Sequence, residues 1–258
     1  MHAALTDRRI ASPAKTAPPV ATAHGGWCID AVLAHVARLA ADPTGTRQRL
    51  VAAAEACARM VAARQRLTLA LDVQHGIERL VQLAGGREQA RCPRPLEREA
   101  LQPHRSEARE RVAQAMVEWR DAGQRFTRAT HLLPTQLSHE LTQAPALNPG
   151  ERQALMQAYV RGGSLAQARD FDEALGRYAA AHRRCDDARD LALAARAARL
   201  KAESDLRIGQ SSLLSVANAW LAELAGVDAM LAAEARRGAA HGALRVLSGD
   251  ILHQASCE

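Results

Sequence analysis

His182 and Cys185 are the residues of this chain whose types and spacing best suit metal chemistry. Side chains three positions apart on a helix are neighbours, and an imidazole with a thiolate suits zinc or copper. No third ligand of defined spacing accompanies them, and two ligands do not make a site. We therefore predict no metal site. His182 is interpreted as a surface histidine and Cys185 as a half-buried cysteine, and these two are the candidates if an ion does bind.

The usual sequence signatures of catalysis and of phosphate binding are missing. Ser211 and Ser212 do not lie in a GxSxG elbow, so we interpret them as candidates for capping a helix. The Gly-Gly-Arg at 85–87 lacks the lysine and the following Ser or Thr of a phosphate loop. We predict no catalytic residues, no cofactor and no enzymatic activity.

The composition favours an all-α protein built from long helices. Of the 258 residues, 48% are hydrophobic but only 3% are aromatic, and helix-forming residues far outnumber strand-forming ones. The formal net charge of +6 comes mainly from arginines that have Asp or Glu within a turn or two, as in 183–187. Such spacing is typical of solvated helix faces with paired charges, so we predict no nucleic-acid partner.

Proline and glycine positions divide the chain into its expected elements. We predict a disordered tail over 1–26, one elongated helical domain over 27–252 and a short tail over 253–258. No secretory signal is visible in the first 26 residues. Helices are expected at 29–41, from about 47 to 66, at 104–133, at 149–207 with a break at 162–163, and at 206–249.

Three further segments need separate interpretation. Leucine and valine alternate with other residues over 67–73, which has the period of a half-buried strand, although leucine also favours a continued helix. Both alternatives stay open, so at most one or two short strands are expected. The three prolines within 91–103 predict a loop or broken segment, and the Gly-Gly at 85–86 predicts a turn.

The stretch 206–249 carries the clearest pattern in the chain. Its apolar residues recur at alternating steps of four and three, which keeps one seam facing a partner helix: Leu213, Ala217, Trp220, Leu224, Val227 and Leu231. The Ala-rich helix over 167–201, folded back at Gly209, is the expected partner. The predicted helix-packing motif comprises Gly209, Ser211, Leu213, Leu214, Trp220, Leu224, Gly162 and Gly163.

The residues 207–216, Arg-Ile-Gly-Gln-Ser-Ser-Leu-Leu-Ser-Val, and the Leu-x-x-Leu-x-Gly ending at 244–249 resemble the C-terminal ascending helix of the TolC-like outer-membrane efflux family. Further stretches fall in that family's order. They are 29–34 with Asp42-Pro43, the helix from Arg47, the strand-like 67–73, the heavy-metal-branch motif at 81–87, Pro134 at a hairpin tip, and 159–165.

The resemblance implies long antiparallel coiled-coil helices in a homotrimeric duct, a passive conduit for metal ions or drugs. It implies a periplasmic adaptor and an inner-membrane pump as partners. It also implies a location in the outer membrane and periplasm, whereas the missing signal peptide would place a complete chain in the cytoplasm. Asp186, Asp187 and Asp190 could face the duct and set ion preference, or form a solvated face paired with nearby arginines. The alternative function is a soluble all-helical interaction or scaffold protein derived from that family, without transport.

Overall fold

The computed structural model describes residues 27–39, 43–89, 97–137, 147–162 and 165–249. These residues form α1 (Ile29–Leu39), α2 (Pro43–Gln89), α3 (Glu97–Thr130), α4 (Pro149–Gly162), α5 (Leu165–Arg207) and α6 (Leu213–Ser248), with a short 3-10 turn at Pro134–Gln136. No strand occurs among them, apart from a single bridge between Trp27 and Leu137. The predicted all-α class is confirmed.

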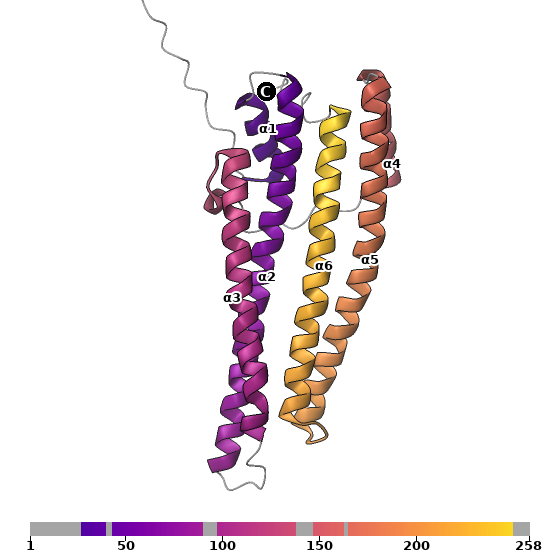
Figure 1. Cartoon of the computed structure of the whole chain (residues 1–258). Helices are drawn as coiled ribbons and strands as arrows, with labels where there is room; N and C mark the ends of the chain where they lie inside the picture. The colour runs from indigo at the N-terminus through magenta and orange to yellow at the C-terminus, as the bar shows by residue number, and fades with distance from the viewer. Residues whose placement is uncertain (1–26, 40–42, 90–96, 138–146, 163–164, 250–258) are drawn as a thin grey trace, which may run out of the picture.

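The four long helices α2, α3, α5 and α6 lie side by side and make up most of the molecule (Figure 1). α2 and α3 form one antiparallel pair, α5 and α6 form a second, and α6 contacts both α5 and α2. α2 has 47 residues, which corresponds to about 70 Å of helix. The short α1 packs on α2, and α4 packs on α6.

α2 continues through the segment where a strand was considered, so that alternative is wrong for 67–73. Its buried residues recur at steps of three and four, at Ala70, Val73, Ile77, Leu80 and Ala84, while Leu71 is 39% exposed. This is the helical period, and it places one continuous stripe against α3 and α6. The turn predicted at Gly85-Gly86 is also wrong, because both glycines lie inside α2.

The proline-rich segment is helical from Glu97 onward, so the loop predicted over 91–103 is wrong for its last seven positions. Pro103 lies inside α3, near its N-terminal end. A proline there removes one backbone hydrogen bond, and the cost is smallest close to a helix start. Leu101 beside it is fully buried against α6, and this packing favours the helix.

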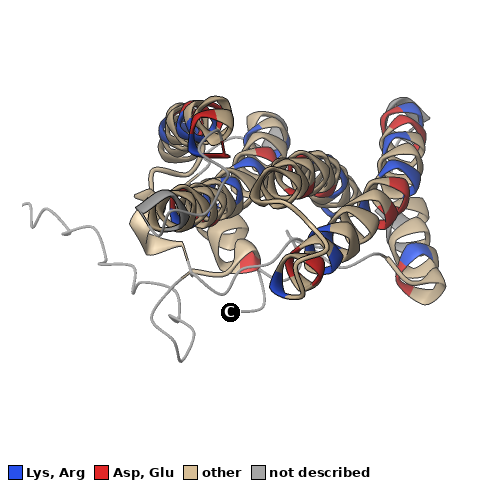
Figure 2. Cartoon of the chain, turned by 90° about the horizontal axis from the view of Figure 1, so that it is seen from below, with Lys and Arg blue, Asp and Glu red and all other residues tan. Residues whose placement is uncertain are grey.

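The core is a seam that runs along the helices rather than a central globule. Its middle section joins Val73 and Ile77 of α2 to Ala108 and Val112 of α3 and to Leu224 of α6. Figure 2 shows Lys and Arg interspersed with Asp and Glu along the helices. A long, narrow core of small side chains follows from the aromatic-poor sequence.

α6 is the one helix in the described ranges that is long and apolar enough to cross a membrane, with a mean hydropathy of 1.2 in its most apolar window. Helices in a protein interior can have the same length and composition. In this structure α6 lies between α2 and α5 (Figure 1).

Candidate functional site

The turn between α5 and α6 is formed by the residues that the sequence singled out. Gly209 has a φ of +76°, a left-handed conformation that costs glycine little. Ser212 caps α6, since its hydroxyl accepts a hydrogen bond of 3.1 Å from the Ser215 amide. Gly249 closes α6 with a φ of +80°. Ser211 is half-buried and does not make this capping bond.

The apolar residues of the predicted motif pack mainly toward α2 and α3. Leu213 is fully buried in a cluster that includes Leu80 and Leu101, and Leu224 lies with Ile77 in the middle of the seam. Leu214, in contrast, is 36% exposed. The motif therefore joins the two helix pairs and does more than hold α6 on α5.

Trp220 lies at the junction of three helices. One edge of its ring covers Gly76 of α2, where an added Cβ would lie 3.1 Å from the ring. The Arg199 guanidinium of α5 lies 4.5 Å from the ring centroid, within cation–π range. Trp220 thus contacts both neighbours of α6. Gly162 is the last residue of α4, and Gly163 lies outside the described residues.

Close helix approach depends on glycines that the sequence analysis missed. An added Cβ at Gly242 of α6 would lie 2.5 Å from the Cβ of Ala54 in α2. At Gly226 it would lie 3.4 Å from the Cα of Ala192 in α5. The available signal was a glycine inside an otherwise strong helix pattern, which often has a packing reason.

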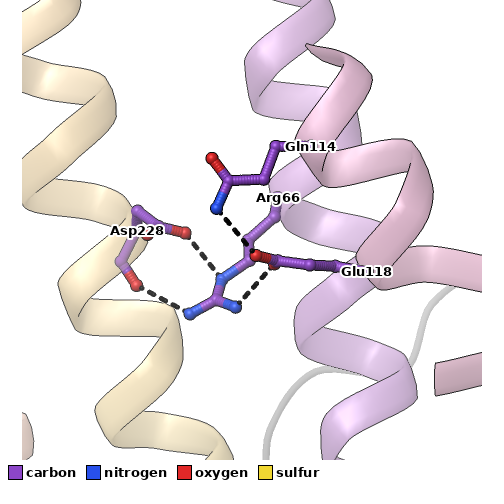
Figure 3. A network of polar contacts seen from close by, with 4 residues as sticks. All are labelled: Arg66, Gln114, Glu118 and Asp228. Carbon is purple, nitrogen blue, oxygen red and sulfur yellow. Dashed lines mark hydrogen bonds and ion pairs between the residues drawn. The ribbon is translucent and has the colours of Figure 1, made fainter. Parts of the chain in front are cut away.

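A polar network links α2, α3 and α6 halfway along the molecule (Figure 3). Arg66 of α2 places Nε 2.6 Å from Asp228 of α6 and donates a 3.1 Å hydrogen bond to Glu118 of α3. Its other terminal nitrogen donates to the Asp228 carbonyl, and Gln114 donates to Glu118. We call Arg66, Glu118 and Asp228 the three-helix clamp. Its ion pairs connect α2 with α3 and with α6.

A second ionic group ties the α5–α6 pair together. Arg199 of α5 pairs with Glu223 of α6 and with Glu203, and Glu223 is only 8% exposed. A buried carboxylate needs such a partner, because an unpaired charge in an apolar seam is costly. This pairing explains why a glutamate is tolerated on the buried face of α6.

The structure places the two metal candidates in different surroundings. His182 stacks on Tyr178, with ring centroids 6.0 Å apart, and its Nε2 lies 3.7 Å from Asp186. Cys185 is fully buried, and burial raises the pKa of its thiol, which disfavours the thiolate that binds metals. Within the described residues there is no group of three or more His, Cys, Asp or Glu side chains that could hold an ion.

The acidic residues that could have lined a duct are exposed on α5. Asp186 lies 3.7 Å from Arg189, as in the paired-face alternative.

An elongated groove of about 1020 Å³ runs between the two helix pairs. All four long helices line it, α2 and α3 on one side and α5 and α6 on the other. Alanines cover much of its surface, and arginines and carboxylates stand among them. We call this feature the Ala–Arg groove. No sequence motif indicated it, because its residues are distributed over four helices.

The chain matches no family model, and no curated protein matches it in sequence. Solved structures do match in fold. A membrane protein from Pseudomonas aeruginosa aligns with a TM-score of 0.63 at 12% identity, covering 86% of this chain and 73% of that one. The outer-membrane channel OprN aligns with a TM-score of 0.58 at 15% identity, covering 86% of this chain and 70% of the channel. The predicted resemblance is thereby confirmed at the level of fold, with an outer-membrane channel among the similar structures.

Proposed function

We propose that this protein forms part of the helical wall of an outer-membrane efflux duct and acts as a passive conduit. One observation carries this proposal, namely the fold shared with the channel OprN over 86% of the chain. Four long helices side by side, held by small-residue seams, suit a wall because their backbones approach closely over a long contact. A wall needs no catalytic group.

The finer parts of the proposal concern assembly and cargo. We propose a homotrimer that works with a periplasmic adaptor and an inner-membrane pump, located in the outer membrane and periplasm. We propose that the conduit carries metal ions or drugs. The Gly-Gly-Arg motif that suggested the heavy-metal branch lies inside α2 rather than at a strand-to-helix junction. Its surroundings therefore give that branch no added support.

A transport assay tests the function directly. A bacterial strain lacking its own outer-membrane duct, but retaining the adaptor and pump, would be given this gene. We expect restored resistance to an exported toxic compound, and the protein to be extracted from the outer-membrane fraction. Correct localisation without any restored resistance, across several adaptor and pump pairs, would refute the conduit role.

A second candidate is a helical interaction protein without transport. It is supported by the unbroken course of α2 through 67–73, where the family resemblance implies a strand. The same assay separates the two candidates, because an interaction protein would restore no resistance.

A further inference from the structure

His241 of α6 lies where α4, α5 and α6 meet. Its ring meets Tyr178 of α5 edge-on, with ring centroids 6.2 Å apart. Leu244, about one turn further along α6, is fully buried in the same cluster as Tyr178, together with Phe171 of α5 and Leu155 of α4. His241 is thus a titratable side chain at the edge of the apolar cluster that holds α4.

α4 is attached to the rest of the molecule through few contacts. Leu155 is the one buried apolar residue among the described side chains of α4, and Tyr159 stacks on an aromatic ring of α5 with centroids 4.5 Å apart. Just before α4, the Leu147 amide donates a 2.7 Å hydrogen bond to the Tyr178 hydroxyl. Tyr178 therefore connects His241 to the start of α4, so a change at His241 can reach α4 through one side chain.

The charges around His241 favour its neutral form. Arg237 and Arg245 lie one turn before it and one turn after it on α6. Glu151 of α4 and Asp30 of α1 also face it. Both carboxylates are already engaged, since Glu151 accepts a hydrogen bond from the backbone amide just before α4 and Asp30 pairs with Arg245. Burial, and after it Arg245, lower the pKa of His241 from its usual value of 6.5.

A proton on His241 would weaken its packing. It would complete a row of three positive charges at successive turns of α6, and like charges at this spacing repel each other. An imidazolium is also poorly solvated at a half-buried position, so turning toward water lowers its free energy and breaks the contact with Tyr178. His182 stacks on the same tyrosine but has Asp186 3.7 Å from its Nε2 to balance a charge.

We propose that His241 is a pH-sensitive latch for α4, which packs on α5 and α6 while the ring is neutral and is released when the ring is protonated. The packed state prefers the neutral ring. Its added stability is therefore complete above about pH 6.5 and is lost as the pH falls through the lowered pKa. Release would uncover Leu244 and the aromatic rings of α5 in the cluster. The latch does not depend on transport, so it can fail separately from the proposed function.

Hydrogen–deuterium exchange of the full-length chain measures the packing of α4. Peptides covering 149–162 would be followed at pH 7.5 and at pH 5.0, with rates corrected for the intrinsic pH dependence of amide exchange, and peptides of α3 would serve as the internal reference. His241→Phe keeps a ring without a charge, and His241→Lys carries a charge at both pH values. His182→Gln is the matched control on the same tyrosine. Circular dichroism would check that each variant keeps its helix content.

We expect the protection of the α4 amides to fall severalfold at pH 5.0 in the wild type and in His182→Gln, while α3 keeps its protection. His241→Phe should keep α4 protected at both pH values, because no charge forms in the cluster. His241→Lys should leave α4 weakly protected at both pH values, because the charge is always present.

Four outcomes would overturn the latch. The first is equal protection of α4 at the two pH values in the wild type. The second is a pH effect that persists in His241→Phe. The third is a parallel loss of protection in α3, which would show acid unfolding of the whole bundle rather than release of α4. The fourth is loss of the effect in His182→Gln, which would assign the titration to His182.

Discussion

Removing the Arg66 side-chain charge tests whether the three-helix clamp holds the two helix pairs together. Arg66→Met keeps much of the aliphatic stem and deletes the guanidinium, which contacts Asp228 and Glu118. Both interactions cross between helices, so their loss acts on tertiary structure rather than on α2 alone. We expect a lower free energy of unfolding with little loss of helix in the folded state.

The exposure of the three side chains sets the size of the effect. The Arg66 side chain is 23% exposed, and the Glu118 and Asp228 side chains are 39% and 50% exposed. The two carboxylates can therefore regain water when Arg66 is removed, and no buried charge is left behind. Partly exposed pairs contribute up to about 1 kcal/mol each. The two pairs together predict a loss of about 1–2 kcal/mol.

Urea unfolding followed by circular dichroism measures the loss. A double-mutant cycle of Arg66→Met with Asp228→Asn should give a coupling energy of about 0.5–1 kcal/mol. High salt should reduce this coupling, because partly exposed charges are screened. Arg59→Met is the matched control. It removes a pair with Glu55 within α2 whose side chains are 53% and 46% exposed, so its effect should stay below about 0.5 kcal/mol.

Two results would refute this reasoning. A coupling energy of zero within error would show that Arg66 and Asp228 are close without stabilising each other. Equal losses for Arg66→Met and Arg59→Met would show that the contacts between helices add nothing beyond a pair within one helix.

Three further predictions concern the cap, the close packing and a buried thiol. Ser212→Ala should lower the free energy of unfolding in urea by about 1 kcal/mol through loss of the α6 cap, and Ser211→Ala should lower it clearly less. Equal losses for the two variants would contradict the assignment of Ser212 as the cap. Gly242→Ala should destabilise the protein by about 1–3 kcal/mol, because the added Cβ would meet Ala54. Gly176→Ala is the control and should stabilise the protein by roughly 0.5–1 kcal/mol, because no atom lies within 4 Å of its added Cβ. A neutral Gly242→Ala would show that the helices can separate there at no cost. Burial raises the pKa of Cys57 from 9.0 to about 12, so its contribution to stability is complete below pH 9 and declines as the pH rises toward 12. At neutral pH a thiol reagent should label this cysteine only after urea unfolding, and rapid labelling of the folded protein would contradict its burial.

The helices with a clear seven-residue pattern could be predicted from the sequence. The α6 seam, its serine cap and its terminal glycine all act locally, within one helix and the turns beside it. Propensity, spacing and capping therefore agree on the same answer. The break between α4 and α5 was also predictable, because its signal, the glycine pair at 162–163, is local in the sequence.

The course of α2 was harder to predict, because its apolar pattern depends on neighbours distant in sequence. Over 67–73 every second residue is apolar, so the local pattern alone suits a strand. In the structure the buried residues of this segment are Ala70 and Val73, and Leu71 is left exposed. The choice was made by contacts with α3 and α6, which the segment itself does not encode.

The three-helix clamp and the Ala–Arg groove could not be derived from the sequence either. Arg66, Glu118 and Asp228 belong to three helices, and no spacing rule connects positions so far apart in the chain. The arginines on the groove wall look like ordinary surface charges on each helix taken alone. They line one groove only when the helix pairs lie side by side.

Substitutions in the buried seam of α6 and on the exposed side of α5 should have different effects. Leu213, Trp220 and Leu224 join the pairs through the buried seam, so substitutions there should lower folding stability and every activity together. Leu193 and Leu200 lie on the exposed side of α5, where substitutions remove little buried contact. A Leu193→Glu variant that folds normally but fails to form the proposed homotrimer, and also fails to restore resistance, would therefore show that the conduit requires assembly between copies. A Leu193→Glu variant that restores resistance as a monomer would show that the conduit does not require it.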